Sequence, residues 1–299
     1  MRVLITGGAG YIGTALCQKL AQDKGILSVT IYDNLSRANY NAFIGIQKLD
    51  QRFRFVHGDI LDSRKLRKAI READIVFHLA AKVTTPFADQ DAHLFEQVNH
   101  WGSAEVGYAV EDSEVQRLVY LSSVSVYGSG GEIKNVETAL NPKTFYGISK
   151  MRGEEHIRRL SDKFQTHIIR CGNVYGYNRS MRFDAVINKF MFEANFQGKI
   201  NIHGNGSQKR PFVFIDTVAA ALMNTMDNQK TSGTFNLVED NFEVNDIVEA
   251  LKTVYPDLEM IYINHNMRMR ELVVDAKQDE EAVIRLTQRL RTFKEQFTF

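Results

Sequence analysis

Tyr146 and Lys150 lie four residues apart in the segment Y-G-I-S-K, well after a glycine-rich stretch near residue 10. On a helix, residues at this spacing lie one above the other on the same face, so the phenol and the ammonium can point at one bound ligand. A fixed cation ~4 Å from a phenolate is worth up to ~4 kcal/mol at an effective dielectric of ~20, which lowers the pKa of the phenol. The pair is therefore a candidate for exchanging protons with an alcohol or sugar hydroxyl. Because this spacing is common on solvated helices, the rest of the chain has to support the interpretation.

Residues 6–13 read T-G-G-A-G-Y-I-G and directly follow a short apolar run. Gly8, Gly10 and Gly13 satisfy the spacing G-x-G-x-x-G, and Gly7, Gly10 and Gly13 satisfy G-x-x-G-x-x-G equally well. Such a turn needs glycine because its φ angles are unusual and a Cβ would keep the backbone away from a pyrophosphate at the helix N-terminus. The alternative is a tight strand-to-helix turn without a ligand.

Asp33 directly follows the second predicted strand, which ends at Tyr32, and it comes twenty residues after Gly13. A carboxylate at this place binds the adenosine ribose hydroxyls, so the two features together predict a dinucleotide site. Its negative charge favours NAD, because it repels the 2′-phosphate of NADP. Arg37 leaves NADP open as the weaker alternative, although we interpret this residue as an exposed loop cation.

Composition and charge narrow the class of protein. The 299 residues are enough for one large α/β unit, or for a main domain with a smaller appendage. A formal net charge of +1 gives no global field that would recruit nucleic acid or an anionic membrane, so any anionic ligand must be held locally.

Cys17 and Cys171 are too few for a disulfide framework and are expected to be buried thiols. Because Met1 leads directly into the first strand and no apolar run reaches ~18 residues, we expect a cytoplasmic protein.

Short apolar runs alternate with amphipathic stretches through the first half, which predicts a doubly wound parallel sheet, the Rossmann fold. The rhythm changes after Cys171, which predicts a smaller C-terminal substrate-binding lobe. The expected NAD-binding domain is 1–172, to which 211–238 returns, and the expected lobe is 173–210 with 239–299. We expect strands at 3–6, 28–32, 53–57, 75–79, 118–122 and 167–170, and helices that begin near residues 11, 63, 91 and 144.

With these motifs in place, the chain resembles the extended short-chain dehydrogenase/reductase family, especially its nucleotide-sugar epimerase and dehydratase branch. The likeness extends over about nine-tenths of the length. It rests on the glycine-rich opening, on segments 58–60, 78–81 and 121–128, and on the Y-x-x-x-K motif. The resemblance implies an NAD site formed by Gly7, Gly10, Tyr11, Ile12, Gly13, Asp33, Asn34, Asp59, Ile60, Leu79, Ala80, Ala81, Tyr146 and Lys150.

The same resemblance implies the catalytic and substrate-binding residues. Ser123 is expected to supply a catalytic hydroxyl beside Tyr146 and Lys150, and Asn99 is expected to support the site. Segments 173–176 and 204–216 resemble those that contact the diphosphate of a nucleotide sugar, and Arg270 is preferred to Arg268 as a second diphosphate ligand. The implied substrate contacts are Lys82, Thr85, Ser123, Ser125, Asn173, Arg210 and Arg270.

The sequence departs from the family pattern at four places. Pro211 stands where an Asp is usual, and Tyr177 stands where a Pro is often found. Val124 and Ser125 occupy positions at which 4,6-dehydratases of this type carry Asp and Glu. Dehydration needs an acid and a base beside the tyrosine, so these two residues count against that reaction.

The function that follows from the resemblance is an NAD-dependent nucleoside-diphosphate-sugar epimerase that acts at C4 by transient oxidation to a 4-keto sugar. An NAD(P)-dependent reductase or dehydrogenase of a nucleotide-linked keto sugar is the alternative, because it uses the same residues. A 4,6-dehydratase and a non-catalytic dinucleotide sensor fit less well. The eight histidines form no metal motif, so no metal is predicted. The resemblance alone implies a homodimer that forms through helices near 91–111 and 144–161.

Overall fold

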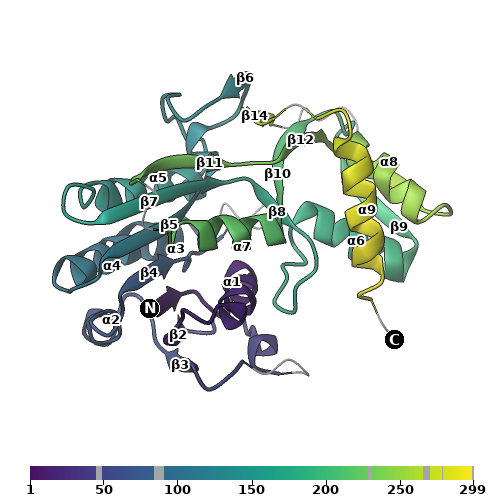
Figure 1. Cartoon of the computed structure of the whole chain (residues 1–299). Coiled ribbons are helices and arrows are strands. Elements are labelled where there is room, and N and C mark those ends of the chain that lie inside the picture. Colours follow the sequence, from purple (N-terminus) through teal and green to yellow (C-terminus); the bar gives the residue numbers. More distant parts are fainter. Residues whose placement is uncertain (45–48, 84–90, 228–230, 265–269, 278, 298–299) are drawn as a thin grey trace.

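A seven-stranded parallel sheet forms the centre of the computed structural model, which describes all residues except 45–48, 84–90, 228–230, 265–269, 278 and 298–299 (Figure 1). The strand order is β11-β7-β5-β4-β1-β2-β3, and every neighbouring pair is parallel. The order of the strands reverses between β1 and β4, and ligands of doubly wound sheets bind at such a switch point. The strands are β1 (Arg2–Thr6), β2 (Ser28–Asp33), β3 (Phe53–His57), β4 (Ile75–His78), β5 (Arg117–Ser123), β7 (Gln165–Cys171) and β11 (Gly233–Leu237).

Helices cover both faces of this sheet, because successive residues of each strand point to opposite sides. Val3 and Ile5 of β1 belong to the apolar cluster that includes helices α1 and α7, whereas Leu4 belongs to the cluster that includes α2, α4 and α5. Strands that are buried on both faces read as continuous apolar runs, which is why the sequence predicts them well. The helices are α1 (Tyr11–Gln22), α2 (Ser63–Ile70), α3 (Ala92–Phe95), α4 (Gly102–Glu111), α5 (Phe145–Arg158) and α7 (Ile215–Asn224).

A smaller lobe packs around its own apolar cluster, beside the carboxyl ends of the strands (Figure 1). Three short sheets belong to this part of the molecule: β12-β10-β8, β13-β9 and β14-β6. Their strands are β6 (Gly130–Lys134), β8 (Asn173–Tyr175), β9 (Lys199–His203), β10 (Lys209–Phe214), β12 (Asp240–Glu243), β13 (Glu259–Ile263) and β14 (Leu272–Val274). Its helices are α6 (Val186–Gln197), α8 (Val244–Val254) and α9 (Ala282–Lys294).

The fold class expected from the sequence is confirmed, since the sheet is parallel and doubly wound. Segment 211–238 behaves differently in its two halves: β11 pairs with β7 in the main sheet, whereas β10 pairs with β8 and β12. The helix expected near residue 91 begins at Ala92 and contains a π-helical stretch, Glu96–Trp101, between α3 and α4. The division into an NAD-binding domain and a substrate-binding lobe stays a prediction.

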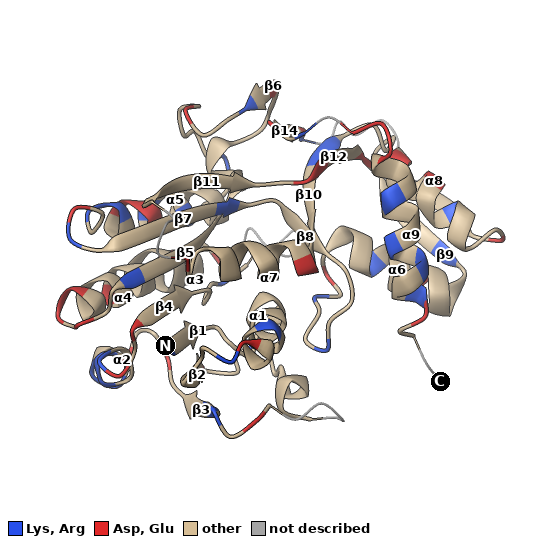
Figure 2. Ribbon diagram, viewed as in Figure 1, with Lys and Arg blue, Asp and Glu red and all other residues tan. Residues whose placement is uncertain are grey.

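Helix α9 joins the smaller lobe to the end of the main sheet through charge. Figure 2 shows several basic residues along this helix. Arg289 pairs with Glu239, which follows β11, at 2.9 Å, and its guanidinium lies 4.4 Å from the ring centroid of Phe214. Arg285 pairs with Asp240 at 2.8 Å. Arg285 and Arg289 of α9 are therefore paired with carboxylates of this chain and are not available to bind an external anion.

Within the described residues, no helix is both long enough and apolar enough to cross a membrane.

The core of the smaller lobe provides a test of the packing. Leu286 of α9 is fully buried, whereas Ile284, two residues earlier, is 59% exposed. We expect Leu286→Ala to lower the free energy of unfolding by about 2–5 kcal/mol, because it removes transfer free energy and leaves a cavity. Ile284→Ala is the matched control and should change stability by less than about 1 kcal/mol. Urea unfolding measures both, and equal effects would contradict the packing of α9.

Candidate active site

The glycine-rich turn lies at the switch point between β1 and β4, and two of its glycines have no room for a side chain. Gly7 has φ of +71°, and a Cβ on it would lie 2.6 Å from the backbone nitrogen of Ala80. A Cβ on Gly13 would lie 2.6 Å from the carbonyl oxygen of Gly7. Gly10 is the N-cap of α1 and makes no side-chain capping hydrogen bond, so the bare backbone amides of this helix end are suited to a pyrophosphate.

Asp33 lies at the carboxyl end of β2, beside the turn. Its carboxylate accepts hydrogen bonds from the backbone nitrogens of Ala9 at 3.0 Å and Leu35 at 2.8 Å. Burial raises the pKa of Asp33, and these two hydrogen bonds oppose the rise. The acceptor is thus fixed next to the turn, at the place where ribose hydroxyls bind in dinucleotide folds. Arg37 is exposed and pairs with Asp184 at 3.4 Å, as expected for a loop cation.

The other predicted adenosine-side residues gather at the ends of β2 and β3. Asn34 donates a hydrogen bond from Nδ2 to Oδ2 of Asp59 at 2.8 Å. The hydroxyl of Tyr32 donates to the backbone oxygen of Asp59, also at 2.8 Å, and Ile60 is buried. This part of the predicted site is therefore held together by direct contacts.

Residues 79–81 follow β4 and are partly buried next to the glycine turn. The neighbouring His78 is fully buried, with Nδ1 2.8 Å from Thr6 Oγ1 and Nε2 3.0 Å from Ser103 Oγ. Burial lowers the pKa of His78 to about 3, so the ring is neutral and suits a structural role rather than acid–base chemistry.

Ser123 and Tyr146 meet where β5 ends and α5 begins. Thr144 fixes the start of α5, because its hydroxyl accepts from the backbone nitrogen of Gly147 at 3.0 Å. Burial raises the pKa of Tyr146, and a hydrogen bond with Ser123 and the charge of Arg182 both act against this rise. The pKa of this phenol thus stays above its ordinary value, and a further positive charge nearby would lower it.

Lys150 follows Tyr146 one turn further along α5. It is only 1% exposed, and its ammonium Nζ lies 4.1 Å from the ring centroid of Tyr120 in β5. Burial lowers the pKa of Lys150 to about 7, so its protonation is finely balanced at neutral pH. A hydrogen bond joins Ser123 and Tyr146, and Lys150 follows one turn later on the same helix; the catalytic role of the three residues stays a prediction.

Asn99 lies within the π-helical stretch and is fully buried. Its Nδ2 donates to the backbone oxygen of Lys82 at 2.9 Å and to Ser149 Oγ at 3.0 Å, and its Oδ1 accepts from the backbone nitrogen of Lys82 at 2.8 Å. The hydroxyl of Ser149 in turn donates to the backbone oxygen of Tyr146 at 2.9 Å. Asn99 therefore fixes the position of the segment after β4 relative to α5.

The structure describes the surroundings of three further residues that are predicted to contact the substrate, namely Lys82, Ser125 and Asn173. The hydroxyl of Ser125 is buried and has no hydrogen-bond partner among the described residues, so it can serve a ligand. Asn173 donates to the backbone oxygen of Pro211 at 2.9 Å, and Lys82 lies 3.8 Å from Asp91. Thr85 lies outside the described residues.

Arg210 and Arg270, the two predicted diphosphate ligands, lie close enough for each charge to act on the other. Burial lowers the pKa of Arg210, the positive charge of Arg270 lowers it further, and Glu271 opposes both. Within the part of the chain that the structure describes, no ion pair is found for Arg210. Two neighbouring guanidinium groups, one of them without a counter-ion, form an attractive site for a diphosphate. Arg268 lies outside the described residues.

Sequence reasoning missed four side chains that surround this centre. Tyr120 lies under the ammonium of Lys150, and Arg182 acts on Tyr146 by its charge. Glu154 is fully buried one turn after Lys150, where it binds Arg170. Glu154 could have been found from the sequence, because it continues the i,i+4 spacing of Tyr146 and Lys150. Tyr120, Arg170 and Arg182 belong to other elements, and the sequence gives no signal for them.

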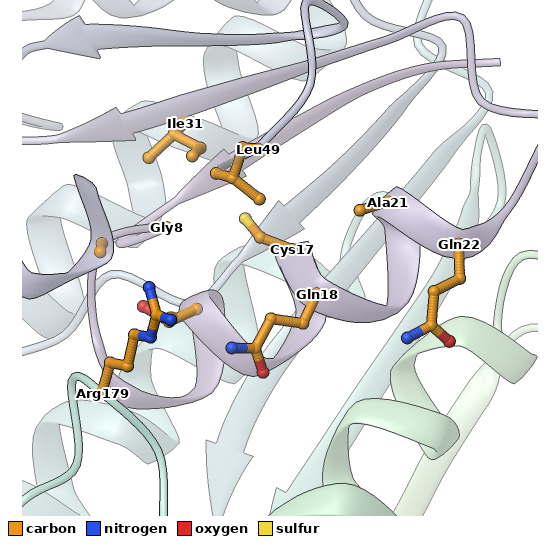
Figure 3. Close-up of a pocket in the computed structure, with 10 residues that line it drawn as sticks. Gly8, Cys17, Gln18, Ala21, Gln22, Ile31, Leu49 and Arg179 are labelled. Carbon is orange, nitrogen blue, oxygen red and sulfur yellow. The ribbon is translucent and has the colours of Figure 1, made fainter. Parts of the chain in front are cut away.

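A separate pocket lies along α1, on the side that faces Ile31 and Leu49 (Figure 3). Cys17 and Gln18 point into it from α1, and Arg179 reaches it from the loop after β8 (Figure 3). Burial raises the pKa of Cys17 to about 12, so its thiol stays protonated and unreactive. The ten residues that line this pocket include none of the predicted catalytic residues.

Among the described residues, no group of three or more His, Cys, Asp or Glu side chains is placed to hold a metal ion.

Comparison with known proteins agrees with this geometry. The sequence profile of the NAD dependent epimerase/dehydratase family matches residues 3–237. UDP-glucose 4-epimerase of Mycolicibacterium smegmatis is 32% identical over 232 residues, which cover 75% of this chain and 72% of that protein. Human dTDP-D-glucose 4,6-dehydratase is 29% identical over 273 residues, which cover 87% of this chain and 76% of that protein.

Solved structures share the fold over almost the whole chain. UDP-N-acetylglucosamine 4-epimerase from Methanobrevibacter ruminantium superposes with a TM-score of 0.85 at 22% identity, covering 98% of this chain and 97% of that one. UDP-glucuronic acid 4-epimerase from Bacillus cereus, solved with NAD, superposes with a TM-score of 0.84 at 21% identity, covering 99% and 96%.

The chain belongs to the NAD dependent epimerase/dehydratase family. The predicted membership of the extended short-chain dehydrogenase/reductase branch is thereby confirmed, as are the enzyme class and the cofactor NAD. The residues present fit this cofactor, since the backbone at Gly7 and Gly13 leaves no space for a Cβ and Asp33 supplies a buried acceptor beside the turn.

The choice between NAD and NADP can be tested at Asp33. We expect Asp33→Asn to raise the Kd for NAD about tenfold, because a charged acceptor is lost. Its effect on NADP should be smaller, since repulsion of the 2′-phosphate is lost at the same time. Isothermal titration calorimetry with both dinucleotides gives the ratio of the two Kd values, which should move toward NADP. Equal weakening of both cofactors would indicate damage to the fold and contradict this role.

Proposed function

We propose that the protein is an NAD-dependent nucleoside-diphosphate-sugar epimerase that acts at C4 of the sugar. The observation that supports the proposal is the hydrogen bond of Tyr146 with Ser123 at the carboxyl end of β5, with Lys150 buried one turn later on α5. The similarity to UDP-glucose 4-epimerase of Mycolicibacterium smegmatis supports it.

In the proposed reaction, Tyr146 as phenolate takes the proton of the C4 hydroxyl. Ser123 holds the sugar oxygen by a hydrogen bond, and the ammonium of Lys150 stabilises the phenolate through its charge. When bound, NAD would supply reversible hydride transfer at C4, so that oxidation of the sugar and its reduction balance. The resulting 4-keto sugar turns its other face toward the cofactor, and Tyr146 gives the proton back to the oxygen at C4. The net result is inversion at C4 without consumption of the cofactor.

The smaller lobe supplies the proposed binding site for the nucleoside diphosphate. Arg210 and Arg270 would hold the two phosphates, and Asn173 would add an amide donor at the edge of β8. The unpartnered hydroxyl of Ser125 would bind the sugar. Lys82 and Thr85 remain proposed contacts from the segment after β4.

A 4,6-dehydratase is disfavoured, although relatives with that activity are among the similar proteins. Val124 is buried in a small apolar cluster with Val126, Tyr127 and Val274. Ser125, the next residue, has a neutral hydroxyl. Neither side chain can give or take a proton at neutral pH, whereas elimination of water from the sugar needs an acid and a base there.

We further propose that the protein acts as a homodimer in the cytoplasm. Trp101 and Tyr108 are exposed on the helix that runs from residue 96 to 111, and His156 of α5 packs against both rings. Exposed aromatic side chains grouped on two neighbouring helices are typical of an interface between subunits. Both cysteines are free and buried, which suits a reducing compartment.

The reaction class can be tested by stoichiometry. Purified protein incubated with UDP-hexoses and a trace of NAD should form the C4 epimer, as measured by NMR, without net use of NADH. Consumption of added NAD(P)H in proportion to product would establish the reductase alternative instead. A 4-keto-6-deoxy product would establish a dehydratase.

The role of Tyr146 can be tested in the same assay. Tyr146→Phe should lower kcat by about 10²–10⁴-fold, because the phenol carries the transferred proton. Tyr262→Phe, on the exposed strand β13, removes the same atom far from the site and should leave kcat unchanged. Full turnover by Tyr146→Phe would be incompatible with the mechanism.

The diphosphate site can be tested by direct binding of UDP. Arg210→Met should raise the Kd about tenfold or more, because a charge-assisted hydrogen bond is lost. Lys209→Met is the matched control, since Lys209 is exposed and lies 3.8 Å from Glu243 instead. Fluorescence or calorimetric titration measures both, and equal Kd values for the two variants would rule out Arg210 as a ligand.

A further inference from the structure

Glu154 is a charged residue in the core for which the proposed reaction so far has no use. It is 0% exposed and lies on α5 four residues after Lys150, which places the two side chains on the same face of the helix. Both reach toward β5: Lys150 lies on the ring of Tyr120, and Glu154 accepts a hydrogen bond from Ser122 Oγ at 2.6 Å. The carboxylate of Glu154 is therefore buried between α5 and β5, beneath the proposed catalytic residues.

Arg170 of β7 holds Glu154 in place. Its Nη2 donates to Oε2 of Glu154 at 2.8 Å, and its Nε donates to Oε1 at 3.0 Å. Its Nη1 donates to the hydroxyl of Tyr127 at 2.9 Å, and that hydroxyl donates to Oδ1 of Asn236 at 2.7 Å. The network ties α5 to strands β5, β7 and β11, and a fork-shaped pair of this kind fixes orientation as well as charge.

Burying the Glu154–Arg170 ion pair in the core costs free energy of desolvation. A buried ion pair is often no more stable than apolar side chains of the same volume, because both charges lose their hydration. Ser122, Arg170 and the half-exposed Arg158 all donate hydrogen bonds to the carboxylate of Glu154, so its orientation is fixed. Stabilisation of the fold alone therefore does not explain this network. Its position beside Lys150 suggests a role in the proposed reaction.

The charges around Lys150 show what that role is. Among the described residues, the titratable groups that act on or touch its ammonium are Tyr120, Glu154 and His78, with Tyr146 one turn earlier on α5. His78 is neutral, so it gives no counter-charge. Glu154 is the carboxylate that opposes the effect of burial on Lys150.

We propose that Glu154, held by Arg170, is a positioning residue that keeps the ammonium of Lys150 charged and aligned beneath Tyr146. The inference rests on the proposed function, in which Tyr146 and Lys150 carry out proton transfer. Glu154 itself does not touch the sugar or the cofactor. It acts through Lys150 and through Ser122, the neighbour of Ser123.

The sign of the effect follows from the charges. Burial alone lowers the pKa of Lys150, and the negative charge of Glu154 raises it again. Replacing Glu154 by Gln removes the opposing charge, so Lys150 should lose its proton at a lower pH. Because Lys150 can stabilise the phenolate of Tyr146 only while its ammonium is charged, the alkaline limb of the pH profile of kcat should move to lower pH.

The titration of Lys150 can be measured without any turnover. Protein labelled with ¹³C at the lysine ε-carbon is titrated by NMR, and the Lys150 signal is identified by its absence in Lys150→Met. Glu154→Gln should lower the pKa of Lys150 by about one unit or more. Glu154→Asp keeps the negative charge, so the pKa of Lys150 should stay close to its wild-type value. Glu155→Gln removes an exposed carboxylate next in sequence and should leave the pKa of Lys150 unchanged. A Lys150 signal that titrates in Glu154→Gln as in the wild type would overturn the proposal.

A second variant covers the case in which Glu154→Gln does not fold, since it leaves Arg170 buried without a partner. The double variant Glu154→Gln/Arg170→Met removes both charges and should show the same lowering of the Lys150 pKa. An unchanged titration in this variant also overturns the proposal. If the wild type converts no nucleotide sugar, the proposed epimerase function fails, while the NMR titration still decides the role of Glu154.

Discussion

The burial of one ammonium group, that of Lys150, constrains much of this structure. A charged group that is 1% exposed must be compensated, because the loss of its hydration is costly. The ring of Tyr120 lies against it, and the carboxylate of Glu154 lies one turn away on the same helix. The result is an ammonium group that is shielded from water, whose pKa is lowered by burial and raised again by Glu154.

The second constraint is the close approach of backbone to backbone at the switch point of the sheet. The backbone of Gly7 lies against that of Ala80, so the turn after β1 and the segment after β4 are in direct contact. Asn99 joins the same segment to α5 through Lys82 and Ser149. The cofactor side and the catalytic side are thus connected by short, directional contacts, and a shift in one of them is passed to the other.

In the proposed reaction the smaller lobe would contribute substrate binding rather than proton transfer. Strand β10 carries Arg210 and pairs with β8, which directly follows the last residues of β7. The guanidinium groups near the lobe are therefore placed relative to the sheet by backbone hydrogen bonds and by the Arg289–Glu239 pair. Orientation of a nucleotide sugar toward Tyr146 then depends on the joint between the two parts.

The sequence by itself determined the parallel sheet, the glycine turn, Asp33 and the Tyr146–Lys150 pair, because each depends on local spacing or on the period of apolar residues. It also indicated Ser123 and Arg210 by their motifs. Only the tertiary structure decided that β10 leaves the main sheet, that Tyr120 lies under Lys150, and that Arg170 holds Glu154. These contacts join residues from different strands and helices, and the period of one segment carries no information about which distant side chain will lie against it.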